Sequence, residues 1–85
     1  MKRIDAVRDF VVENFLFGEA NGIRDDTAFL ESGVIDSTGM LELVGFLETR
    51  FRIRMEDDEI VPEHLNSLLR IDAYLERKLS GRAPG

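Results

Sequence analysis

The 85-residue chain has no cysteine and no tryptophan, and it contains only two prolines and one histidine. Without cysteine it can form neither a disulfide nor a thiolate metal site, so any thiol chemistry must arrive on a prosthetic group. No stretch approaches the ~20 apolar residues that a membrane span needs, and the charged N-terminal segment lacks the apolar core of a signal peptide. We therefore expect a soluble, cytoplasmic protein.

Positive charge is also scarce, because 17 acidic residues outnumber 11 basic ones and give a formal net charge of −6. This balance argues against nonspecific binding of nucleic acid and favours basic protein partners. The imbalance is greatest between residues 24 and 48, where Arg24 is the only basic residue. The acids of this stretch are Asp25, Asp26, Glu31, Asp36, Glu42 and Glu48. We expect the surface that they form to be acidic.

The sequence contains few residues that could form a catalytic site. His64 lies in an expected short helix, and no Ser-His-Asp grouping is visible around it, so we interpret it as structural or exposed. The acids from Glu56 to Glu59 are consecutive rather than alternating around a glycine, as a calcium loop requires. A solvated charge run is the better interpretation, and we predict no metal site.

The length predicts one small domain, which we assign to residues 1–80, followed by a flexible tail at 81–85. Apolar residues spaced by three and four positions predict helices over residues 2–16 and 37–51. Their apolar positions are Ile4, Val7, Val11 and Phe15 in the first helix and Met40, Leu43, Leu47 and Phe51 in the second. The intervening residues 17–36 read as a long loop, which should be packed because it has apolar side chains to bury. These side chains are Ile23, Phe29, Leu30, Val34 and Ile35.

Two further helices are predicted in the C-terminal third. Pro62 can open a short helix that reaches Leu65, and Ser67 can cap a last helix with apolar positions through Leu79. We therefore predict an all-α fold, a small bundle of three longer helices and one short helix, with the long loop between the first two.

The segment GVIDSTGMLELV at residues 33–44 is the most informative part of the chain. It places Ser37 where a loop meets a helix. The first backbone N–H groups of a helix lack partners and its dipole is positive there, so a phosphodiester on the Ser37 oxygen would be favoured. Asp36 and Ser37 would equally serve an ordinary helix start as capping residues. Gly39 costs up to ~1 kcal/mol in the first turn, so either this turn is frayed or a neighbouring group must approach the backbone closely there, and we favour the second interpretation.

Residues on both sides of Ser37 extend this motif. They are FLESGV at residues 29–34, Glu42-Leu43-Val44 and Leu47-Glu48. Over most of its length the chain resembles acyl carrier proteins. In that family the serine after the aspartate carries 4′-phosphopantetheine, whose thiol holds an acyl group as a thioester. The resemblance implies that Ser37 is attached to this arm by a phosphopantetheinyl transferase, and that Asp36 assists the transfer by holding magnesium. It also implies an acyl or amino-acid ligase and a downstream synthase or transferase as partners.

Partners of this family dock on the helix that follows the serine, through its acids. The resemblance thus implies a partner surface formed by Thr38, Gly39, Leu41, Glu42 and Glu48, with weaker contributions from Asp57 and Asp58. A plain solvated face is the alternative for each of them.

Some residues depart from the pattern of fatty-acid carriers. Many of those have leucine after the serine, where this chain has Thr38, and Arg50, Arg52 and Arg54 dilute the acidic surface. The serine followed two residues later by glycine is similar to D-alanyl and aminoacyl carriers, and residues 60–63 look like discrete carriers of polyketide or nonribosomal peptide pathways. We expect a free-standing, monomeric acyl or aminoacyl carrier that is not itself an enzyme. The alternative is an acidic helical adaptor that binds partners without modification.

Overall fold

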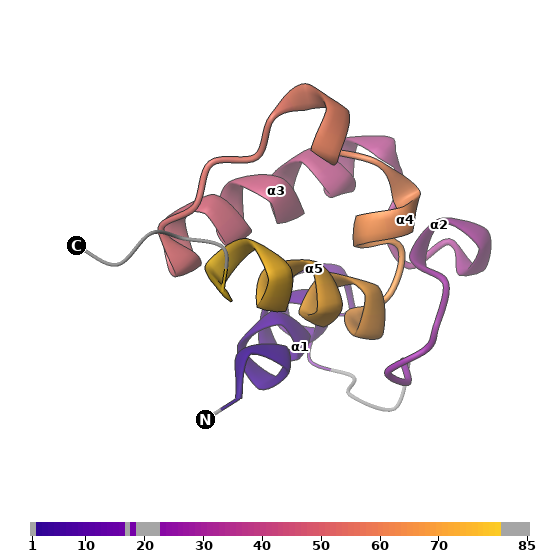
Figure 1. Cartoon of the computed structure of the whole chain (residues 1–85). Helices are drawn as coiled ribbons and strands as arrows, with labels where there is room; N and C mark the ends of the chain where they lie inside the picture. Colours follow the sequence, from indigo (N-terminus) through magenta and orange to yellow (C-terminus); the bar gives the residue numbers. More distant parts are fainter. Residues whose placement is uncertain (1, 17, 19–22, 81–85) are drawn as a thin grey trace.

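A computed structural model describes residues 2–16, 18 and 23–80 of the chain (Figure 1). These residues form helices and connecting turns and contain no strand. The elements are α1 (Arg3–Phe15), α2 (Phe29–Ser32), α3 (Ser37–Phe51), the 3₁₀ helix η2 (Asp57–Glu59), α4 (Pro62–Leu65) and α5 (Leu68–Ser80). The predicted all-α bundle with three longer helices is confirmed. The tail expected at 81–85 lies outside the described residues.

The stretch predicted as one long loop contains an additional helix, α2. Its start is held by a distant residue: the N–H of Phe29 donates to the carbonyl oxygen of Asn66 (2.8 Å), and the N–H of Leu30 donates to Asn66 Oδ1 (2.9 Å). The helix ends at Gly33, whose left-handed φ of 80° suits glycine. The local sequence carries no sign of this cap, because the residue that accepts both bonds lies 37 positions after Phe29 and 36 after Leu30.

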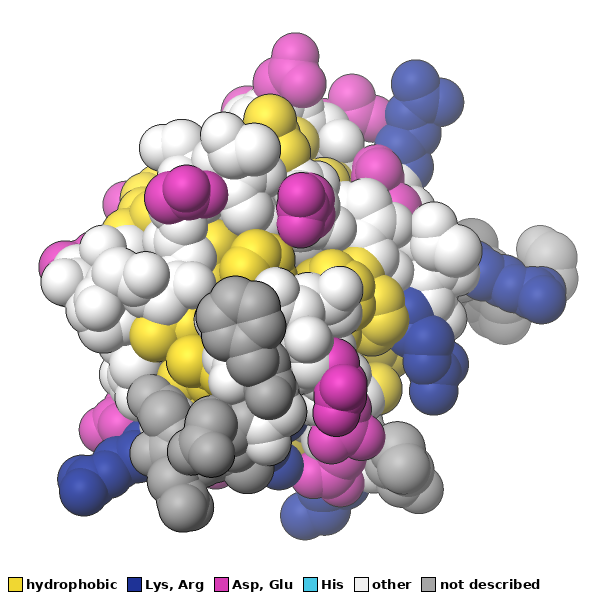
Figure 2. Space-filling model, turned by 180° about the vertical axis from the view of Figure 1, so that it is seen from behind, with side chains coloured by type: hydrophobic (Ala, Val, Ile, Leu, Met, Phe, Trp, Pro, Cys, Tyr) yellow, Lys and Arg dark blue, Asp and Glu magenta, His cyan; other side chains and the backbone are white. Residues whose placement is uncertain are grey.

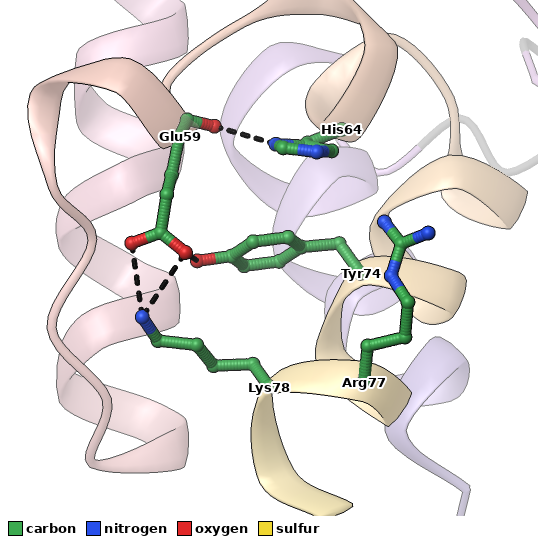
Figure 3. A pocket seen from close by; sticks show the side chains of 5 residues that line it. All are labelled: Glu59, His64, Tyr74, Arg77 and Lys78. Carbon is green, nitrogen blue, oxygen red and sulfur yellow. Dashed lines mark hydrogen bonds and ion pairs between the residues drawn. The ribbon is translucent and has the colours of Figure 1, made fainter. Parts of the chain in front are cut away.

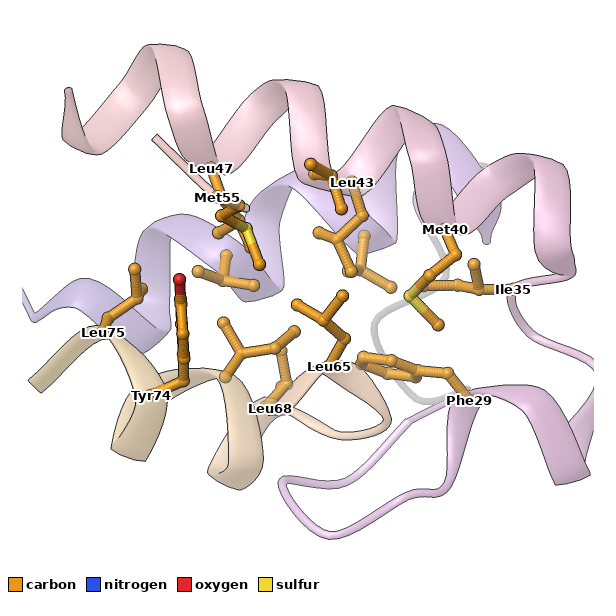
Figure 4. Close-up of a cluster of buried hydrophobic side chains, with 14 of the residues drawn as sticks. Phe29, Ile35, Met40, Leu43, Leu47, Met55, Leu65, Leu68, Tyr74 and Leu75 are labelled. Carbon is orange, nitrogen blue, oxygen red and sulfur yellow. The ribbon is translucent and has the colours of Figure 1, made fainter. Parts of the chain in front are cut away.

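The three long helices enclose one core, shown in Figure 4. Val7 and Val11 of α1, Leu43 and Leu47 of α3, and Ile71 and Leu75 of α5 are completely buried. Each fully buried aliphatic side chain of this size contributes about 1.5–3 kcal/mol. The segment before α3 adds Phe29 and Ile35, as predicted, but Leu30 remains 37% exposed instead of packing into the core.

The chain turns sharply after α3. Arg52 adopts a left-handed conformation (φ 55°) that ends the helix, and the N–H of Met55 donates to the Glu48 carboxylate (2.9 Å). After this turn the chain runs back along α3 to η2 and α4, which lie near the first turn of α3 (Figure 1). No helix among residues 2–16 and 23–80 has the length and apolar content needed to cross a lipid bilayer.

Candidate functional site

Ser37 is the first residue of α3, and its side chain is exposed. The preceding Asp36 caps the helix, because its Oδ1 accepts a hydrogen bond from the N–H of Gly39 (2.7 Å). Among the described residues, the Ser37 hydroxyl has no hydrogen-bond partner, and the N–H groups of Ser37 and Thr38 have no acceptor. A free hydroxyl therefore stands beside two free backbone donors at the positive end of a helix dipole, an arrangement that suits an anion on this oxygen.

Gly39 fixes how the first turn of α3 packs. A Cβ at this position would lie 2.7 Å from Cε1 of Phe15 and 3.0 Å from Cγ2 of Ile35. The first distance is shorter than real Cβ contacts and the second is unusually tight, so glycine allows the end of α1 to pack directly on the turn that holds Ser37. The close approach predicted from the sequence is confirmed, and the approaching groups are side chains.

An apolar pocket of about 190 Å³ lies beside Ser37. Seven of its eight lining residues are apolar, and they come from α2, α3 and the stretch from the end of η2 to α4. The lining consists of Leu30, Ser37, Met40, Leu41, Ile60, Val61, Pro62 and Leu65. Leu41 is 64% exposed, so part of the pocket wall is open to solvent.

Sequence reasoning did not place Leu30, Ile60 and Val61 next to Ser37. Each is an apolar residue in a stretch expected to be irregular, and that is the only local signal they give. Their neighbourhood depends on α2 and α4 packing together through Asn66, whose Nδ2 also donates to both oxygens of the Glu31 carboxylate (3.0 and 2.9 Å).

The residues predicted to face partners fall into two groups. Thr38, Leu41 and Glu42 are exposed on the first turns of α3, and Asp57 and Asp58 are exposed on η2. Gly39 is buried beneath Phe15, which leaves it no surface for a partner, and Glu48 is half-buried with its carboxylate bound to the Met55 amide.

The acid run before α4 was predicted to be solvated, and for Glu59 this is wrong. Its carboxylate accepts hydrogen bonds from Lys78 Nζ (2.9 and 3.1 Å) and from the Tyr74 hydroxyl (3.0 Å), both on α5 (Figure 3). The N–H of Glu56 also donates to it (2.9 Å). These bonds, the one from Glu56 foremost and then that from Lys78, lower the pKa of Glu59 to about 2.

His64 and Tyr74 complete this cluster. The His64 Nδ1 lies 2.9 Å from the carbonyl oxygen of Glu59, and its ring lies 4.9 Å from that of Tyr74. Burial, and then the hydrogen bond to Glu59, raise the pKa of Tyr74 above its ordinary value. The cluster fastens η2 and α4 to α5 and so holds Ile60 and Val61 in the wall of the pocket beside Ser37.

No group of three or more histidine or acidic side chains that could hold a metal ion occurs in the part of the chain that the structure describes. The start of α3 presents an exposed hydroxyl with anion-stabilising neighbours, next to an apolar pocket.

No protein-family model matches the chain. It is 33% identical to an acyl carrier protein of Helicobacter hepaticus over 76 residues, which cover 89% of this chain and 96% of that protein. It is 27% identical to the probable acyl carrier protein PigG of a Serratia species, over 79% of this chain and 77% of that protein. With an all-helical bundle and a relative matched over nearly its whole length, the chain belongs to the acyl carrier protein family, whose members are carriers and not themselves enzymes.

Proposed function

We propose that the protein carries an acyl or aminoacyl group as a thioester on a 4′-phosphopantetheine arm that is attached to the Ser37 oxygen. Family membership supports a carrier role. The observation that supports Ser37 as the attachment site is its exposed, unpartnered hydroxyl beside the two free N–H groups at the start of α3.

The residues around Ser37 fit such an arm. The free N–H groups of Ser37 and Thr38 and the helix dipole favour the negative charge of a phosphodiester, by about 0.3–1 kcal/mol for an exposed site. Asp36 uses Oδ1 for the cap, while its Oδ2 has no partner among the described residues and is free to help hold magnesium during attachment. The bound arm supplies the thiol that a chain without cysteine lacks.

The pocket beside Ser37 limits how much cargo can be sheltered. Its volume of about 190 Å³ slightly exceeds that of an engineered cavity of ~150 Å³ that holds benzene. It can therefore take a small ring or a short chain that folds back onto the protein, and a long acyl chain would extend into solvent. We propose a specialised pathway of the lipid, polyketide or nonribosomal peptide type, because Thr38 after the serine and the arginines near the end of α3 depart from fatty-acid carriers.

The partners that this function requires are a phosphopantetheinyl transferase, an acyl or amino-acid ligase and a downstream synthase or transferase, which we expect to meet a monomeric carrier in the cytoplasm. We propose that they contact the exposed residues nearest Ser37, namely Thr38, Leu41 and Glu42, and that Asp57 and Asp58 extend this surface. Glu48 can contribute through the carboxylate oxygen that is not bound to Met55.

Intact mass spectrometry tests the attachment. The folded protein is incubated with coenzyme A, magnesium and, in parallel, two phosphopantetheinyl transferases of different specificity, beside Ser37→Ala and the matched control Thr38→Ala. We expect a gain of one phosphopantetheine in the wild type and in Thr38→Ala, and none in Ser37→Ala. If neither transferase modifies the folded wild type, an unmodified adaptor is the better account.

A further inference from the structure

A second groove lies between α1 and α3, on the side of these helices that faces away from α5. It has a volume of about 350 Å³ and shares no lining residue with the pocket beside Ser37. Its lining consists of Ala6, Asp9, Phe10, Glu13 and Asn14 of α1 and Phe46 and Arg50 of α3. Figure 2 views the molecule from this side and shows hydrophobic side chains exposed between acidic ones.

Aromatic rings form the floor of the groove. Phe10 and Phe46 stack with centroids 4.2 Å apart and planes inclined by 16°. Phe15 meets Phe10 edge-on at 6.0 Å, and Phe51 meets Phe46 edge-on at 6.4 Å. All four rings are only half-buried. Phe10 and Phe46 line the groove, so it presents aromatic as well as acidic groups to a ligand.

The α1 wall carries two acids that form no ion pair among the described residues, although Arg50 lines the opposite wall with its guanidinium over the Phe51 ring. Asp9 and Glu13 are exposed, lie one turn apart and so repel each other. Glu13 also lies in the last turn of α1, where the helix dipole disfavours negative charge and no basic residue offsets it. Neither acid has an ionic partner among the described residues, whereas Asp5 on the same helix pairs with Arg8 at 2.9 Å. A bound cation would reduce both the repulsion between Asp9 and Glu13 and the unfavourable interaction of Glu13 with the helix dipole.

One contact within the chain illustrates how a guanidinium packs on a ring of this aromatic cluster. The guanidinium carbon of Arg50 lies 5.5 Å from the centroid of the Phe51 ring, so this side chain already uses an aromatic neighbour. A guanidinium can pack flat on a ring while its N–H groups bind a carboxylate, which the compact ammonium of lysine does less well.

We propose that the groove between α1 and α3 binds an arginine side chain of a partner protein, with its guanidinium against Phe10 and Phe46 and its N–H groups donating to Asp9 and Glu13. This is a docking surface separate from the one around Ser37, and it does not depend on the arm being attached. The two acids exclude nucleic acid and other polyanions as occupants.

The test uses the unmodified, isotope-labelled protein and a soluble probe, an acetylated and amidated peptide of alternating leucine and arginine. The control peptide has citrulline in place of arginine, which keeps the shape and removes the charge. NMR titration of backbone amides should show the largest shifts at residues 9–14 and 46–50 with the arginine peptide, and the citrulline peptide should bind at least threefold more weakly.

Two variants with equal charge changes locate the effect. Asp9→Asn with Glu13→Gln should weaken binding by about 3- to 10-fold, the loss expected for two exposed ion pairs. Asp26→Asn with Glu63→Gln removes two exposed acids elsewhere and should change the affinity by less than about twofold. Four results would each overturn the proposal. They are an equal loss of affinity in both variants, equal binding of the two peptides, amide shifts centred on residues 37–42, and no binding at all.

Discussion

The two glycines within α3 give a matched pair for testing how α1 packs against the Ser37 turn. Gly45 is exposed and a Cβ there would meet nothing within 4 Å, so Gly45→Ala should stabilise the protein by about 0.5–1 kcal/mol through helix propensity. Gly39→Ala has the same gain available, but its Cβ would lie 2.7 Å from Phe15 and 3.0 Å from Ile35. Overpacking of this kind costs about 1–3 kcal/mol, which leaves a net loss of about 1 kcal/mol.

Urea unfolding of the unmodified protein, followed by circular dichroism at 222 nm, measures both free energies of unfolding. The two variants should differ by about 1.5–2 kcal/mol, which for a domain of this size separates their melting temperatures by about 10 °C. Equal stabilisation by Gly39→Ala and Gly45→Ala would refute the reasoning, because it would mean that Phe15 and Ile35 do not constrain the first turn of α3.

Two further predictions concern acids. The pKa of Glu59 is lowered from 4.5 to about 2, so its stabilising effect is present above about pH 4.5 and is lost as the pH falls towards 2. Its side chain is 24% exposed, and we therefore expect Glu59→Gln to cost about 1–2 kcal/mol of unfolding free energy at pH 7. The variant should also flatten the dependence of this free energy on pH between about 4.5 and 2. An unchanged dependence in that range would contradict the role of Lys78 and Tyr74. Asp36→Ala should cost about 1 kcal/mol by removing the cap, whereas Asp36→Asn should keep the stability within a few tenths of a kcal/mol. If Asp36 also holds magnesium, Asp36→Asn slows attachment of the arm in timed mass spectra, and an unchanged rate would restrict Asp36 to capping.

The long helices could be predicted because their signals are local. The apolar spacing of α3 and the acid before it are contained within one segment, and so is the exposed serine at its start. Helix α2 was missed because its first N–H groups bond to Asn66, and nothing near Phe29 in the sequence indicates that partner. Hydrophobic periodicity does not predict short helices that depend on hydrogen bonds to distant residues.

The surroundings of the site were less predictable for the same reason. Glu59 was grouped with its solvated neighbours, but the two side chains that bind it lie 15 and 19 positions later on α5. The apolar wall beside Ser37 exists only once η2 and α4 fold back against α3. The aromatic groove was likewise not foreseen, since the rings that form it belong to two helices whose relative placement periodicity does not give.

The most direct test of the account is to locate the arm within the chain. After treatment with transferase, coenzyme A and magnesium, trypsin should release residues 25–50 as one peptide, because no lysine or arginine lies between Arg24 and Arg50. Tandem mass spectrometry of this peptide should place a single phosphopantetheine on Ser37. A group found on Thr38, on Ser32 or on another peptide would contradict the assignment of Ser37 as the attachment site.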